Sequence, residues 1–221
     1  MARNKHPEIT YERIVLAATE LFVENGYYNT SVQDIVDKVG LSKGAIYHHF
    51  ESKEEILKAV LERRARHTYK RYDAAVREER DLTGKEKIQR ILLASSNEKK
   101  ASPFDSFLMG HMRDPFFAVD SMRSSMKYDA PMLSKWIREG VADGSLDVEE
   151  PELCAEMILV LFNLWAGPMM FYHSRKKTER IFKYLQHITK LIGANIITDQ
   201  QIEAFLMVFE ENGIWKQDKL T

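Results

Sequence analysis

The most constraining feature of this chain is a pair of short predicted helices within residues 30–57, joined by a tight turn and followed at once by a third helix. In the first, the apolar residues recur at i, i+3, i+4 and i+7, on one stripe of a helix. Gly40 follows where a helix end needs positive φ, and Ser42 can cap the second helix. That helix is short, because a new capping-box sequence starts at Ser52. Such short helices are marginal alone and need other helices to pack against.

The second short helix is predicted to present a small, polar face to solvent. Ile46 and Phe50 lie four residues apart on one side, so Gly44 and His48 lie at the centre of the other. Two helices at this spacing form a helix-turn-helix, which places its second helix in the major groove of DNA. We therefore predict double-stranded DNA as a partner of this chain.

The side chains on and beside that face suit a DNA surface. Gly44 and Ala45 lack bulk and allow close approach to base edges, while Tyr47 offers a hydrogen-bond donor, and phosphates receive most such bonds. Lys43 can swing outward from the first helical position. Lys53 adds a cation beside the free amides of the next helix, where phosphate is favoured.

The run GLSKGAIYHHFESKE at residues 40–54, within the longer stretch 14–61, closely resembles the DNA-binding domain of the TetR (tetracycline repressor) family of transcriptional regulators. The resemblance covers roughly the first fifth to quarter of the chain. It implies that Tyr47 and Lys53 contact phosphates and that residues 42–45 approach bases. The predicted DNA-binding residues are Thr30, Ser31, Ser42, Lys43, Gly44, Ala45, Tyr47, His48 and Lys53.

The composition of the chain limits its chemistry and compartment but does not indicate a binding partner. The 221 residues carry a formal net charge of −1, and residues 1–66 hold ten basic and ten acidic side chains, so DNA affinity has to come from local placement. Cys154 is the single cysteine, which excludes an internal disulfide; no metal spacing or cofactor motif is evident. The start resembles neither a signal peptide nor an anchor, and the apolar stretch 157–172 is too short to span a bilayer. A cytoplasmic protein without a membrane partner is expected.

Every periodic segment is helical, so the predicted fold class is all-α. We expect a three-helix helix-turn-helix domain at residues 1–55 and a larger helical effector-binding and dimerisation domain at 56–221. Gly26 is predicted to end the first helix, and Pro131 to kink or split a helix at 120–143. The further helices are predicted near 67–80, 85–100, 104–113, 151–172, 176–193 and 199–213.

The predicted helix at 151–172 is apolar on nearly every side, so it has to be covered twice. One cover is its own domain; the other is expected to be a second copy of the chain, with the helix at 176–193. TetR-like proteins typically dimerise through such a late pair of helices, and a homodimer would read a palindrome. A monomeric core helix is the alternative. The stripe expected to help cover it is Ile181, Leu185, Ile188 and Ile192.

Methionine and aromatic residues crowd the middle of the chain, and such residues suit an adaptable apolar pocket. At helical spacing the same residues are more often plain core. The TetR resemblance implies a small apolar or amphipathic effector bound there. The candidate effector residues are Phe107, Met109, His111, Met112, Met126, Trp136, Phe162, Asn163, Trp165 and Met169.

The predicted function is thus a homodimeric TetR-like transcriptional regulator, a repressor that binds a palindromic operator and is released from it by the effector. An architectural or cell-division factor of the same fold, without an effector, is the alternative. An enzyme is not expected. The sequence at 40–44 fits G-x-S-x-G, but that motif needs a strand before its serine, and a helix precedes it here.

Overall fold

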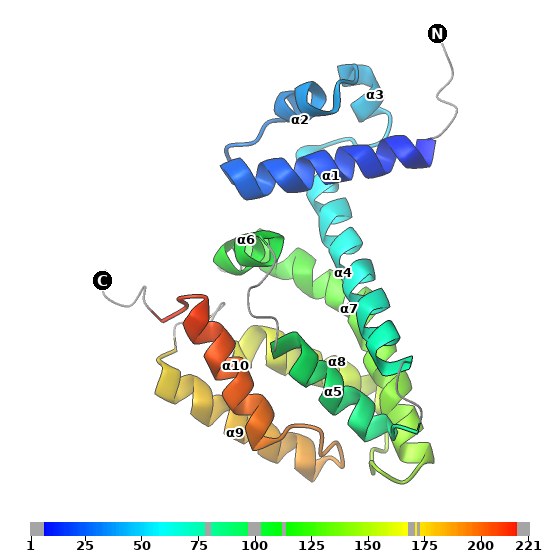
Figure 1. Cartoon of the computed structure of the whole chain (residues 1–221), viewed down its shortest axis with the longest axis vertical. Helices are drawn as coiled ribbons and strands as arrows, with labels where there is room; N and C mark the ends of the chain where they lie inside the picture. The colour runs from blue at the N-terminus through cyan, green and yellow to red at the C-terminus, as the bar shows by residue number, and fades with distance from the viewer. Residues whose placement is uncertain are drawn as a thin grey trace. The chain divides into compact units, whose positions relative to one another are not determined.

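The computed structural model describes residues 7–77, 81–96, 103–111, 114–167, 171 and 173–215, and every regular element in these ranges is a helix. The all-α prediction is confirmed. No helix among these residues is long and apolar enough to cross a membrane. The elements are α1 (Pro7–Asn25), α2 (Val32–Val39), α3 (Lys43–Tyr47), α4 (Lys53–Arg77), α5 (Gly84–Ser96), α6 (Pro103–His111), α7 (Pro115–Ala142), α8 (Pro151–Val160), the π-helix η1 (Leu161–Ala166), α9 (Arg175–Leu191) and α10 (Asp199–Glu211) (Figure 1).

The chain forms two compact units. The first comprises Met1–Arg64 with Ser102–Leu108, and the second Ala65–Ala101 with Met109–Thr221. Two helices, α4 and α6, therefore contribute residues to both units. The predicted domain boundary between residues 55 and 56 stays a prediction.

The first unit is a small helical core around α1. Its helices α2 and α3 lie along one side of α1 (Figure 1). Gly26 ends α1 in the left-handed region at φ 82°, as predicted. Phe22, Ile35 and Ile46 are fully buried, and each such side chain contributes about 1.5–3 kcal/mol to folding. This burial holds the five-residue helix α3, which is too short to be stable alone.

The second unit has a separate core in which α7 packs against α8, and α5 against α7 and α10. Its centre is aromatic: the rings of Phe182 and Phe205 stack 5.7 Å apart, and the ring of Phe162 meets that of Phe205 edge-on at 5.0 Å. Cys154 is buried beside this core, which raises the pKa of its thiol to about 11. A thiol with that pKa is almost entirely protonated at neutral pH, so Cys154 has the structural role that is typical of a buried cysteine.

The contact between α5 and α7 depends on two glycines. The Gly84 amide donates to Asp143 Oδ2 at 2.7 Å, so the end of α7 caps the start of α5. Bonds from the Ser145 hydroxyl and from Gly84 hold the pKa of Asp143 below its ordinary value. A Cβ on Gly84 would lie 2.1 Å from the Gly140 nitrogen. The two helices can approach this closely because Gly84 has no side chain.

Two helices differ from the predicted boundaries. Helix α7 starts at Pro115 behind an Asp114 cap and continues past Pro131 without splitting. Pro131 removes a helical hydrogen bond, but buried residues on both sides of it, Phe117 and Ile137 among them, hold the helix together. The predicted helix at 151–172 instead ends its α-helical part at Val160, changes to η1 and stops at Gly167, which is extended.

Candidate nucleic-acid interface

The turn between α2 and α3 is fixed by local hydrogen bonds. Ser31 caps α2: its hydroxyl accepts from the Asp34 amide, and the Asp34 carboxylate accepts from the Ser31 amide at 2.7 Å. These bonds lower the pKa of Asp34. Gly40 follows α2 in the left-handed conformation at φ 70°, with its amide donating to the Val36 carbonyl oxygen. The capping box and the glycine together set the angle at which the chain enters α3.

Helix α3 presents the face that the sequence predicts. Ser42 caps it by accepting from the Ala45 amide, and Ile46 is buried beneath it. On the opposite side Tyr47 is 46% exposed, and Lys43 lies 5.8 Å from the centre of the Tyr47 ring. A cation and a phenol thus stand together on a solvent-facing surface, a combination that suits phosphate.

Gly44 is exposed on the same face, and no contact within the protein requires a glycine at this position. A Cβ built at this position meets no other atom within 4 Å, and its φ is not positive. The fold therefore accepts any small side chain there. The space beside Gly44 is available for close approach by another molecule.

Lys53 is held by the first unit itself. Its ammonium donates to the carbonyl oxygens of Tyr27 and Thr30, both at 2.9 Å, and lies 4.3 Å from the centre of the Tyr27 ring. Two of its three donor hydrogens are thereby used, so at most one is free for a phosphate. Lys53 consequently ties α4 to the α1–α2 turn, and a substitution there would disturb the fold as well as DNA binding.

Thr30 does not face solvent. It is 1% exposed, and its hydroxyl lies 2.8 Å from the Gly26 carbonyl oxygen and 3.2 Å from that of Leu21. The Thr30 side chain thus bonds to the end of α1, and Ser31 is the cap of α2. The predicted DNA-binding role of Thr30 stays a prediction. The sequence left both residues open as the cap, because both have a hydroxyl at the right distance.

Lys38 looks like a further surface cation but is paired within the domain. Its ammonium lies 3.0 Å from Glu20 and 3.4 Å from Glu24, two carboxylates one turn apart on α1. The bond to Glu20 is the main cause of the raised pKa of Lys38. Lys38 therefore joins α2 to α1, which leaves Lys43 as the cation on the α3 face.

His49, next to that face, lies against aromatic rings. Its ring is 6.5 Å from that of Tyr11, which stacks on Phe50 at 5.0 Å. Burial, and secondly the charge of His48, lower the pKa of His49 below its ordinary 6.5. The folded chain then binds fewer protons at this site than the unfolded chain, so stability is present above pH 6.5 and is lost as the pH falls below it.

We expect His49→Gln to lose less thermal stability than the wild type between pH 7.5 and pH 5, because the variant has no imidazole to protonate. The measurement is the melting temperature at a series of pH values, at one protein concentration. His67→Gln, which removes an exposed histidine of α4, is the control and should follow the wild-type profile. Identical profiles for His49→Gln and the wild type would contradict this assignment.

The described candidate effector residues belong to both units. Phe107 lies in the first unit, where it is buried and its ring stacks on that of Phe22 at 6.5 Å. Phe107 therefore packs on α1, and its predicted effector role stays a prediction. The sequence gives no sign of this, because α6 divides between the two units and an apolar side chain suits either.

Three candidates lie together in the π-helix η1, and all three are half-buried: Phe162, Asn163 and Trp165. The Asn163 side-chain amide donates to the Ser125 hydroxyl of α7 at 3.3 Å, and the Trp165 ring meets that of Tyr184 edge-on. Single-turn π-helices are frequent at functional sites because their wider turn displaces side chains. The periodicity of the sequence does not predict this feature.

The other candidates are spread over α6 and α7. His111 packs its ring 5.1 Å from that of Phe117, and Met126 is half-buried on α7. Met112 and Met169 lie outside the described residues, as does the side chain of Met109.

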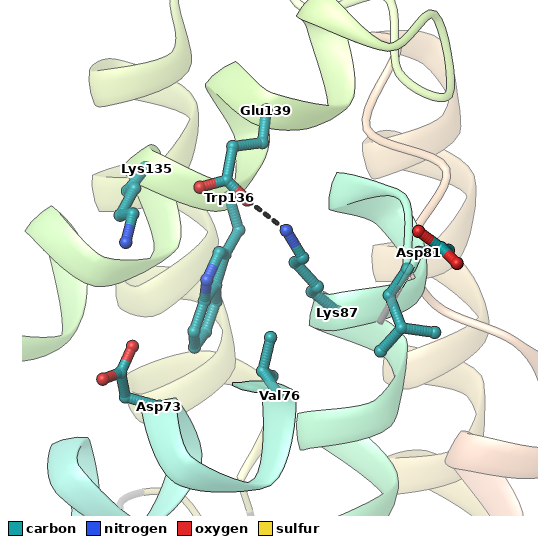
Figure 2. A pocket seen from close by; sticks show the side chains of 8 residues that line it. Asp73, Val76, Asp81, Lys87, Lys135, Trp136 and Glu139 are labelled. Carbon is teal, nitrogen blue, oxygen red and sulfur yellow. Dashed lines mark hydrogen bonds and ion pairs between the residues drawn. The ribbon is translucent and has the colours of Figure 1, made fainter. Parts of the chain in front are cut away.

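Trp136 is buried and lines a pocket of about 220 Å³ in the second unit. Figure 2 shows the Trp136 ring between the side chains of Lys135 and Lys87, with the Lys87 ammonium bonded to Glu139 at 2.7 Å. The lining is Asp73, Val76, Asp81, Leu82, Lys87, Lys135, Trp136 and Glu139. A lining so rich in charge does not suit an apolar effector, and it includes no other candidate effector residue.

Comparison with known proteins decides the family. Residues 14–60 match the model of the bacterial regulatory proteins of the tetR family. The transcriptional repressor KstR2 of Mycolicibacterium smegmatis is 28% identical over 160 residues, which are 66% of this chain and 70% of KstR2. The chain belongs to the TetR family. This TetR-family member is a DNA-binding transcriptional regulator, and its relatives are regulators rather than enzymes.

Solved structures share the fold of this TetR-family chain over nearly its whole length. RolR in complex with resorcinol superimposes with a TM-score of 0.66 at 17% identity, over 91% of this chain and 95% of RolR. FadR of Bacillus subtilis in complex with stearoyl-CoA gives 0.57 at 19% identity, over 85% and 100%. At this identity the likeness extends to the fold alone.

Proposed function

We propose that this chain is a homodimeric repressor that binds a palindromic operator through α3 and releases it when a small apolar or amphipathic effector binds to the second unit. The exposed face of α3 carries this proposal. Lys43 and Tyr47 stand there as phosphate-contacting groups beside Gly44, whose open side suits a base edge.

Exposed apolar faces on α8 and α9 support a dimer. Leu153 is 62% exposed on α8, and Leu191 is 72% exposed on α9, where Tyr184 lies two turns earlier on the same side. Ile181 and Leu185 of the predicted stripe face the core of the second unit instead. Each helix thus has one apolar face inside and another outside, and a second copy of the chain would cover the outer face.

Repression is supported by the relative KstR2, which is a repressor. An effector is supported by RolR and FadR, whose structures hold resorcinol and stearoyl-CoA. The two helices shared by both units, α4 and α6, give such an effector a route to the DNA-binding unit. An effector acts in this way only if it binds one arrangement of these helices more tightly than the other.

The test compares Tyr47→Phe with the wild type in a mobility-shift titration on a duplex selected by the wild-type protein. We expect affinity to fall roughly 10- to 30-fold on every sequence, because a dimer loses two phosphate hydrogen bonds of about 1 kcal/mol each. Tyr28→Phe removes another exposed tyrosine hydroxyl of the first unit, in the turn between α1 and α2 rather than on α3, and should bind like the wild type.

Gly44→Ala tests the base-reading part of the same face. Since the fold leaves space for a Cβ at Gly44, this variant should keep its melting temperature but change its preference among duplexes that differ in the half-site. Wild-type affinity for Tyr47→Phe, together with unchanged preference for Gly44→Ala, would reject α3 as the reading helix.

A further inference from the structure

Two neighbouring residues near the start of α7 carry buried polar atoms without partners. Among the described residues, the buried side-chain atoms that lack a hydrogen-bond partner include Asp120 Oδ2 and Ser121 Oγ, and both ring nitrogens of His173. Asp120 is 4% exposed, and its other oxygen accepts from Arg123 at 3.1 Å. Native proteins rarely leave such atoms unpaired, and an unpaired group points to a bound water or ligand.

Ser121 begins a polar stripe along α7. Ser125 and Asp129 follow at four-residue intervals, so the three side chains lie on one face of the helix. The Ser125 hydroxyl donates to Asp129 at 2.7 Å and accepts from the Asn163 amide of η1. The stripe therefore faces η1. Ser121 lies one turn before Ser125 on this stripe. Its hydroxyl has no hydrogen-bond partner, whereas the Ser125 hydroxyl has two.

The π-helix η1 lies beside α7, where Asn163 contacts Ser125. Helices α7 and α8 run antiparallel, because a short connection joins the end of α7 to the start of α8 while Asn163 reaches back to Ser125. His173, which is buried with both ring nitrogens unpaired, follows η1 in the sequence. Apolar side chains accompany the polar ones: Met122 and Met126 on α7 and Phe162 on η1 are half-buried.

We infer that the Ser121 hydroxyl, between the Asp120 carboxylate and the Asn163–Ser125–Asp129 chain of hydrogen bonds, recognises a neutral hydroxyl group on the effector. This rests on the proposed function, which supplies the effector, and specifies its chemistry: an apolar body that carries an alcohol or phenol.

The charged groups beside Ser121 favour an alcohol or phenol over a carboxylate or an amine. An ionised carboxylate can only accept hydrogen bonds, so Asp120 favours a ligand group that donates one, and a serine hydroxyl can do either. A ligand carboxylate beside Ser121 would lie next to Asp120, a group of its own sign. A ligand ammonium would gain little from Asp120, because that carboxylate is already paired with Arg123. The ammonium would also have to lose its hydration shell. A neutral hydroxyl supplies the donor at the lowest desolvation cost.

The experiment titrates the full-length protein with 2-naphthol and 1-decanol by calorimetry, against the carboxylates 2-naphthoate and decanoate and the amines 2-naphthylmethylamine and decylamine. We expect at least one alcohol to bind at least 10-fold more tightly than its matched carboxylate and amine. Ser121→Ala should weaken binding of that alcohol 5- to 10-fold while its melting temperature without ligand stays equal or rises, because an unpaired buried hydroxyl is removed.

Ser134→Ala is the control, since Ser134 is a buried serine of the same helix whose hydroxyl already donates to the Pro131 carbonyl oxygen. It should lower the melting temperature and leave alcohol binding unchanged. The inference is overturned if no alcohol binds, if a matched carboxylate or amine binds more tightly, or if Ser121→Ala destabilises the protein without changing alcohol affinity. An alcohol that binds as expected but does not release DNA would leave this site in place and reject the proposed regulation instead.

Discussion

Gly84→Ala is expected to lower the free energy of unfolding of the second unit by about 3 kcal/mol or more, at the upper end for an overpacked site. The added Cβ would lie 2.1 Å from the Gly140 nitrogen and 2.4 Å from the Trp136 carbonyl oxygen, which are both backbone atoms of α7. Neither can move without displacing the helix. In a chain of this size, such a loss lowers the melting temperature by roughly 6–12 °C, which thermal denaturation at one protein concentration measures.

Substitutions at two other glycines serve as comparisons for this prediction. Gly140→Ala would place its Cβ 2.7 Å from a methyl group of Leu146, a side chain that can rotate, so the loss should be smaller. Gly44→Ala meets nothing within 4 Å and should melt like the wild type. The melting temperature should be lowest for Gly84→Ala, higher for Gly140→Ala and highest for Gly44→Ala. Any other order would contradict the described packing of α5 on α7.

The double variant Tyr184→Glu with Leu191→Glu is expected to be a monomer and to lose at least about 100-fold in operator affinity. Both side chains are more than half exposed on one face of α9, so the carboxylates cost little in the monomer but would be buried against each other in a dimer. A monomer holds one half-site only and loses the gain from two linked contacts, which is commonly 10²–10⁴. Analytical ultracentrifugation and a mobility-shift titration measure the two effects.

Met207→Glu is the matched control for this pair. Met207 is an apolar side chain that is 56% exposed on α10, a helix outside the proposed dimer face on α8 and α9. It should remain a dimer with wild-type DNA affinity. If the double variant stays dimeric, the outer faces of α8 and α9 are not the interface.

The helix-turn-helix could be predicted closely from the sequence because its determinants are local. A cap, a glycine with positive φ and four apolar residues at helical spacing specify α2 and its turn without reference to distant residues. Local chemistry failed where two residues compete for one role: either Thr30 or Ser31 could cap α2, and only the packing of α1 places Thr30 inside.

The second unit was predicted less well because its features depend on contacts between distant residues. Pro131 ends a helix in isolation, yet α7 continues because its buried residues on both sides are held by neighbouring helices. The change from α8 to η1 leaves no mark in the hydrophobic pattern. Phe107 is apolar wherever it lies, so the sequence could not assign it to α1 rather than to an effector site.

The central claim is that this TetR-family chain reads a palindrome as a dimer through α3, and selection of duplexes from a random DNA library by the full-length protein tests it most directly. The account predicts enrichment of an inverted repeat whose half-site sequence changes when Gly44→Ala replaces the wild type. Enrichment of no sequence, or of a single asymmetric site that Gly44→Ala selects equally well, would contradict it.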